Sequence, residues 1–204
     1  MEQPLKKVQT DMLLKMLALP LLFLFGALVM AEDSTLPLFD FAEATAAKEW
    51  QTVNDGVMGG VSEGKFRITE AKTLEFTGTL SLENNGGFAS VRSKSKKLSL
   101  EKGDTVVAKV RGDGREYTLN LYVKRLRIAF AYQAAMPTKK DEWVEVRIPL
   151  DQFEATSFGN KVKDAGPVNP DEVNAVGFLL GDKKAGPFQL EIESIKVERT
   201  AVKE

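Results

Sequence analysis

Short segments of alternating apolar and polar residues recur along this chain, and they restrict its fold more than any other feature. In residues 117–123 (YTLNLYV) every second residue is apolar or aromatic, as in a strand with one buried face. Residues 143–150 repeat the pattern, and residues 188–198 change phase at Glu193-Ser194, which predicts a β-bulge. Other predicted strands are residues 65–69, 74–82, 87–93, 105–110, 128–133 and 174–180.

These segments amount to about nine or ten short strands separated by turn signals, a pattern typical of a β-sandwich or jelly roll. No segment has the pattern of a long amphipathic helix, although residues 42–50 and 170–173 each suit a short turn of helix. The longest irregular stretch is residues 154–169. We therefore predict an all-β protein with a single jelly-roll sandwich over residues 32–204.

The first 31 residues differ from the rest. Three lysines precede an apolar run at residues 16–30, and Val29 and Ala31 suit a signal peptidase. The run is short for a membrane span and Pro20 interrupts it. We expect residues 1–31 to be a cleaved signal peptide, with Met12 as an alternative start, and the protein to be periplasmic or extracellular. An uncleaved segment would instead anchor it to a membrane.

Composition limits the chemistry of the chain. Its 204 residues include no cysteine and no histidine, so disulfides, thiolate metal sites and serine–histidine or cysteine catalysis are excluded. The formal net charge is −1, which gives no reason to expect a nucleic-acid partner. We expect no cofactor.

Four glycines crowd residues 53–64 (VNDGVMGGVSEG). Gly59 and Gly64-Lys65 approach a P-loop, but Phe66 replaces the required hydroxyl and the following residues resemble a strand, so a nucleotide site is not indicated. A turn explains the segment better: Asn54 and Asp55 would bind nearby backbone N–H groups, and Gly56 would adopt positive φ.

Gly86-Gly87, in LENNGGFASVR, repeats the combination of amide side chains followed by glycines. Both loops have a structural explanation, and the alternative is that they meet at one rim and bind a partner. The candidate interaction surface comprises Asn54, Asp55, Gly56, Met58, Gly59, Gly60, Ser62, Gly86, Gly87, Phe88 and Arg92.

Acid–base catalysis would require two carboxylates across a cleft. Four aspartates lie beside apolar residues at strand ends and are weak candidates for such a pair or for a calcium site, since no D-x-D-x-D-G loop is present: Asp40, Asp55, Asp151 and Asp182. We predict no catalytic and no metal-binding residues.

Aromatic residues favour a different kind of site. If some of them face outward beside Arg92, Arg127 or Gln133, a sheet face could bind a sugar or another protein; the alternative is that most are core. The residues concerned are Tyr117, Tyr122, Tyr132, Trp143 and Phe178.

The segments VNDGVMGGVSEG, FTGTLSLENNGGFASVRS, RGDGREYTLNLYV, WVEVRIPLDQF and VGFLLGDKKAGPFQLEIESI resemble, in this order, the complex I intermediate-associated protein 30 family. The resemblance extends from about Pro37 to Arg199. It implies a galactose-binding-like β-sandwich and a chaperone-like assembly factor that binds proteins and is not an enzyme. We therefore expect an exported, non-catalytic domain that binds a protein partner, with a carbohydrate-binding module as the alternative.

Overall fold

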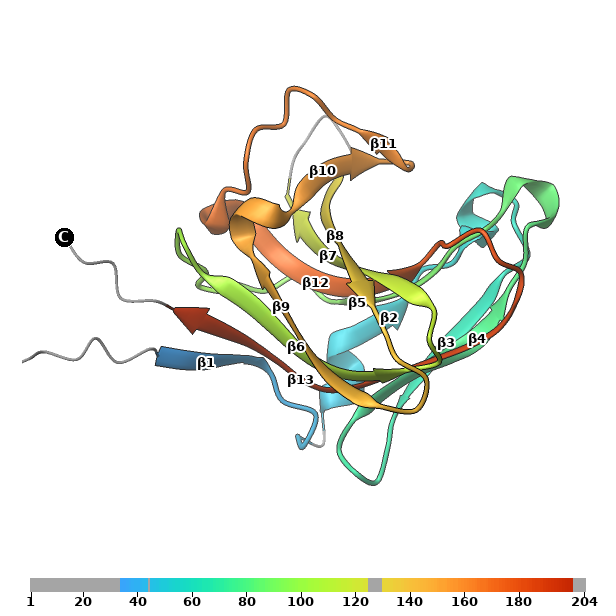
Figure 1. Ribbon diagram of the computed structural model, residues 1–204, viewed down its shortest axis with the longest axis horizontal. Helices are drawn as coiled ribbons and strands as arrows, with labels where there is room; N and C mark the ends of the chain where they lie inside the picture. The colour runs from blue at the N-terminus through green and yellow to red at the C-terminus, as the bar shows by residue number, and fades with distance from the viewer. Residues whose placement is uncertain (1–33, 44, 125–129, 200–204) are drawn as a thin grey trace, which may run out of the picture. The chain divides into compact units, whose positions relative to one another are not determined.

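The computed structural model describes residues 34–43, 45–124 and 130–199, and it shows an all-β sandwich of two antiparallel sheets (Figure 1). The six-stranded sheet has the order β3-β4-β13-β6-β9, and β1 also pairs with β13. Its strands are β1 Ser34–Phe39, β3 Glu63–Ile68, β4 Leu74–Leu80, β6 Thr105–Gly112, β9 Trp143–Pro149 and β13 Gly186–Arg199.

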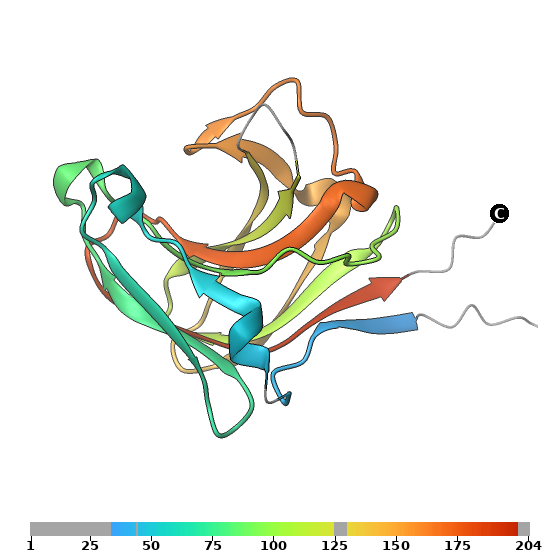
Figure 2. The same cartoon turned by 180° about the vertical axis from the view of Figure 1, so that it is seen from behind.

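The seven-stranded sheet has the order β11-β10-β8-β7-β12-β5-β2 and curves so that β10 and β11 rise at one edge (Figures 1 and 2). Its strands are β2 Trp50–Thr52, β5 Ala89–Ser93, β7 Glu116–Val123, β8 Ala131–Pro137, β10 Glu154–Ser157, β11 Asn160–Lys161 and β12 Val173–Leu180. Short 3-10 turns interrupt the strands: η1 Ala46–Glu49, η2 Asp55–Met58, η3 Glu83–Asn85, η4 Leu150–Gln152 and η5 Pro170–Glu172.

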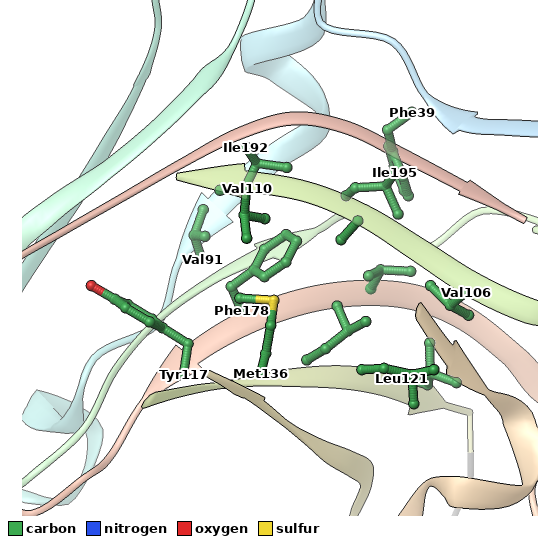
Figure 3. Packing of buried hydrophobic residues seen from close by; sticks show 14 of the residues in the cluster. Phe39, Val91, Val106, Val110, Tyr117, Leu121, Met136, Phe178, Ile192 and Ile195 are labelled. Carbon is green, nitrogen blue, oxygen red and sulfur yellow. The ribbon is translucent and has the colours of Figure 1, made fainter. Parts of the chain in front are cut away.

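The core lies between the two sheets, where Phe178, Leu121 and Met136 from one sheet face Val110 and Ile192 from the other (Figure 3). All five of these side chains are fully buried. Burying one such side chain stabilises a fold by about 1.5–3 kcal/mol, so this layer is the main source of stability.

Each of the nine predicted segments overlaps a strand, although residues 128–129 of one segment lie outside the described residues. The register of β13 against β6 shifts between Ile192 and Ser194, which confirms the predicted bulge. Four other strands, β1, β2, β10 and β11, were not predicted. The stretch 154–169 is less irregular than expected, because it contains the β10–β11 hairpin, whose two-residue turn is Phe158-Gly159. The predicted signal segment, residues 1–31 with the alternative start at Met12, lies outside the described residues.

Candidate functional site

The loop between β2 and β3 is organised by one turn of 3-10 helix. Residues Asp55–Met58 form η2, which ends at Gly59 with φ +91°, a left-handed conformation that glycine adopts without strain. The prediction that Gly56 has positive φ is wrong: among the described residues of this loop, only Gly59 does. The reversal comes after the helical turn, because η2 continues through Gly56 in a right-handed conformation.

The Asp55 carboxylate joins this loop to the β4–β5 loop. Its Oδ1 accepts a hydrogen bond from Ser62 N (2.9 Å), and its Oδ2 accepts from Ser62 Oγ (2.6 Å), Gly87 N (2.7 Å) and Phe88 N (3.3 Å). Asp55 is fully buried. Ser62 Oγ also accepts from Ser81 N (3.0 Å), so a buried carboxylate and a buried hydroxyl hold the two loops together.

These contacts explain the ionisation of Asp55. Burial favours the neutral acid, but the hydrogen bonds from the Ser62 hydroxyl and from the amides of Gly87, Ser62 and Phe88 outweigh it. The pKa of Asp55 therefore lies below its usual value, and the carboxylate remains charged inside the fold.

Two glycines make room for this carboxylate. A Cβ atom at Gly60 would lie 2.4 Å from Asp55 Cγ, and one at Gly86 would lie 2.5 Å from Asp55 Oδ2. Neither glycine has positive φ, so both are required by close packing rather than by backbone conformation. Asn54 completes the corner, donating from Nδ2 to the Gly64 carbonyl at 3.0 Å.

The structure brings together most of the predicted surface residues, as η2 and η3 lie side by side in both views (Figures 1 and 2). Within this corner Met58 is half-exposed, Phe88 is partly buried, and Asp55 and Ser62 are buried. Arg92 lies elsewhere: it projects from β5 onto the outer face of the seven-stranded sheet, where its guanidinium lies 4.8 Å from the centre of the Tyr122 ring.

Three exposed apolar side chains on the same two loops were not predicted from the sequence. Val57, Val61 and Leu82 are 72%, 49% and 46% exposed, and Met58 is 50% exposed. We call these four residues the glycine-loop surface. The available signal was the presence of large apolar residues inside glycine-rich turns, where polar residues are more usual.

The aromatic residues divide between core and surface. Tyr117, Tyr132 and Phe178 are fully buried, whereas Trp143 is 37% exposed. Tyr122 lies on the outer face of β7 with Arg92, as the binding hypothesis required; Arg127 falls outside the described residues.

The remaining candidate acids have local structural roles. Asp182 forms an ion pair with Arg115 (2.6 Å), which helps to lower its pKa against the effect of burial. Asp40 Oδ1 accepts from Ala42 N, and Asp151 is exposed in the first turn of η4. No group of three or more acidic side chains placed to hold a metal ion occurs among the described residues.

Comparison with known families identifies the family of this chain. The family model for complex I intermediate-associated protein 30 (CIA30) matches residues 39–192. The chain belongs to this family. Two of the segments that carry the resemblance contain Asp55–Ser62 and Gly86–Arg92, which include the residues through which Asp55 joins the two loops.

Two curated relatives are both named complex I intermediate-associated protein 30, mitochondrial. The mouse protein is 30% identical over 183 residues, covering 78% of this chain and 55% of the relative. The Drosophila melanogaster protein is 28% identical over 193 residues, covering 84% of this chain and 65% of the relative. The chain thus spans between 55% and 65% of the length of these two relatives.

Solved structures agree on the fold. The family 11 carbohydrate-binding module of Clostridium thermocellum, in complex with a β-1,3-1,4-mixed-linked tetrasaccharide, has a TM-score of 0.64 at 13% identity, covering 85% of this chain and all of the module. A second structure of a family 11 module, from the cellulase Lic26A-Cel5E, gives 0.64 at 14% identity, covering 86% of this chain and 98% of the module. This likeness confirms the galactose-binding-like sandwich alone.

The relatives correct one expectation. Both are mitochondrial by name, which contradicts the periplasmic or extracellular location expected from residues 1–31. Basic residues followed by a short apolar run indicate a segment with membrane affinity, but this pattern does not specify the membrane system to which a protein is sent. Between residues 34 and 199, leaving aside 44 and 125–129, no helix is long and apolar enough to cross a membrane.

Proposed function

We propose that this protein is a non-catalytic assembly factor that recognises a protein partner through the glycine-loop surface. The observation that carries the proposal is the display of four large apolar side chains, between 46% and 72% exposed, on loops fixed by a buried carboxylate. Exposed apolar groups on a rigid support favour association, because little conformational entropy is lost on binding.

The charged residues around the glycine-loop surface restrict the kind of partner that it can bind. Residues 51–64 and 81–91 contain no lysine or arginine, whereas Glu63 and Glu83 are exposed beside the apolar side chains. An apolar patch with an acidic border complements an apolar segment flanked by lysine or arginine. An anionic membrane surface would be repelled by the same border.

The names of the relatives support a proposal for the partner. Because they are intermediate-associated proteins of complex I, we expect this chain to bind an intermediate in the assembly of respiratory complex I. Two observations support a binding role over catalysis. The chain has no histidine or cysteine, and the carboxylates of Asp55 and Asp182 are each bound by other residues, Ser62 and Arg115 respectively.

The test compares two variants in cells that lack the native protein. Native gel separation should show the wild-type protein migrating with complex I intermediates, and the double variant Met58→Ser/Leu82→Ser should lose this association by at least about tenfold. The matched control is Phe158→Ser, which removes a side chain that is 79% exposed on a different loop, the turn of the β10–β11 hairpin. Equal association of both variants, with unchanged thermal unfolding, would contradict the proposal.

A second candidate function is carbohydrate binding. It is favoured by the polar outer face of the seven-stranded sheet, where Tyr122 and Arg92 stack. A glycan array with the full-length protein tests it, and an absence of binding to every glycan would eliminate it.

A further inference from the structure

The outer face of the seven-stranded sheet carries a polar row that crosses six strands. Tyr117, Leu119 and Leu121 of β7 point into the core, so Asn120 points to the opposite face. Its register partners are Gly177 on β12 and Gln133 on β8. Extending the register in both directions gives the row Gln51, Arg92, Gly177, Asn120, Gln133 and Glu154.

The row has a flat centre. A Cβ atom at Gly177 would lie 2.7 Å from the Val91 carbonyl oxygen and 3.0 Å from Cε2 of Tyr122. The missing side chain lets the Tyr122 ring lie across the neighbouring strand, and the Arg92 guanidinium lies above that ring. The result is a stacked platform beside two amide side chains, those of Asn120 and Gln133.

The amide of Asn120 is incompletely bonded. This residue is only 1% exposed, and its Nδ2 donates to Tyr122 Oη at 3.0 Å, but its Oδ1 has no hydrogen-bond partner within the described chain. An unpaired buried carbonyl costs about 1–3 kcal/mol. Asn54 Oδ1 is also unpaired, but it lies 2.6 Å from where a Gly64 Cβ would be, in a corner closed by Phe76 and Ala89.

The two outer faces of the sandwich differ in charge. On the six-stranded sheet, charged side chains pair with one another across strands, as in Arg111–Glu191 and Lys109–Glu193. On the polar row, Arg92 is the one cation, and Glu154 is paired with Lys161 at the sheet edge. Most of the row is neutral, and its amides can both donate and accept hydrogen bonds.

We propose that this row is a binding site for a neutral, hydroxyl-rich ligand, a saccharide chain lying across the strands. Saccharide hydroxyls both donate and accept, which matches the amides, and a sugar ring can stack on the guanidinium platform. A ligand hydroxyl would supply the donor that Asn120 Oδ1 lacks. This proposal rests on the second candidate function and assigns its site.

The test is isothermal titration calorimetry of the full-length protein with three saccharides in turn: the β-1,3-1,4-mixed-linked tetrasaccharide, cellotetraose and agarotetraose. We expect at least one of them to bind with a millimolar or lower Kd. Arg92→Met and Gln133→Ala should each weaken that binding by about tenfold or more. The matched control is Arg67→Met, which removes an arginine from the outer face of the other sheet.

The outcomes separate the site from the function. Binding that is weakened by the first two variants and unchanged in the control supports the proposal. Binding that is equal in wild type and both sheet-face variants overturns the site but leaves carbohydrate binding in place. No binding of any of the three saccharides by the wild type overturns the proposed site, the glycan array then decides carbohydrate binding as a whole, and recognition of a protein by the glycine-loop surface is unaffected.

Discussion

Two buried polar side chains, Asp55 in the glycine loops and Asn120 on the sheet face, are at the centres of the two candidate sites. Both are at most 1% exposed. The Asp55 carboxylate accepts four hydrogen bonds from the protein, whereas Asn120 Oδ1 accepts none from the described residues. A complete set of partners indicates that a buried group stabilises the fold, and an incomplete set indicates where another molecule can add a bond.

Removing the Asp55 carboxylate should have the largest effect. Asp55→Ala leaves the amides of Gly87, Phe88 and Ser62 without their acceptor, so the free energy of unfolding should fall by about 3–5 kcal/mol. Urea denaturation at pH 7 measures it. The exposed Asp151→Ala should change stability by less than about 0.5 kcal/mol. A loss below about 1 kcal/mol for Asp55→Ala would remove the distinction between the two buried groups.

Crowding the carboxylate should have the next effect. Gly60→Ala places a methyl group against Asp55 and should destabilise the fold by about 2–3 kcal/mol. Gly56→Ala is its matched control, because a Cβ there meets nothing within 4 Å and the residue has no positive φ. Similar thermal unfolding temperatures for the two variants would show that the loops adjust freely around Asp55.

Acid should weaken the same contact. Because the folded-state pKa of Asp55 is lowered, its contribution is complete above the unfolded-state pKa of about 3.9 and is lost as the pH falls through the folded-state value. Wild type should therefore lose stability more steeply than Asp55→Asn between pH 5 and pH 2. The comparison requires unfolding free energies at several pH values, and parallel curves would refute it.

The smallest effect should come from Asn120. Asn120→Leu loses one hydrogen bond to Tyr122 and removes an unpaired carbonyl, so stability should change by less than about 1 kcal/mol in either direction. Urea denaturation of Asn120→Leu and of Asp55→Ala under the same conditions compares the two losses in unfolding free energy. A loss as large as that of Asp55→Ala would mean that Asn120 is structural, and would weaken the inference of a ligand site.

The sequence predicted what depends on local pattern. Alternation located nine strands and the bulge at Glu193-Ser194, and the Asn-Asp pair before glycines indicated a turn. Strands β2 and β11 were not predicted, because strands of three and two residues are too short to show an alternating pattern. They form because a neighbouring strand offers unpaired backbone groups.

The polar row was hidden for a different reason. Neighbouring members of the row are between 13 and 85 positions apart in the sequence, and only the register of six strands places them side by side. Gly177 gave no turn signal, and Asn120 is one polar residue in an alternating strand. The Asp55 contacts to Gly87 and Phe88 are equally non-local, although both loops were recognised separately.

The pairing of β1 with β13 has a practical consequence for handling the protein. Ser34 lies opposite Arg199, so the two ends of the described sandwich leave it side by side, at the end away from η2 and η3 (Figure 1). An affinity tag, fluorescent protein or surface tether attached at either end would leave the glycine-loop surface pointing outward. The same adjacency suits the sandwich for insertion as a cassette into a loop of another protein.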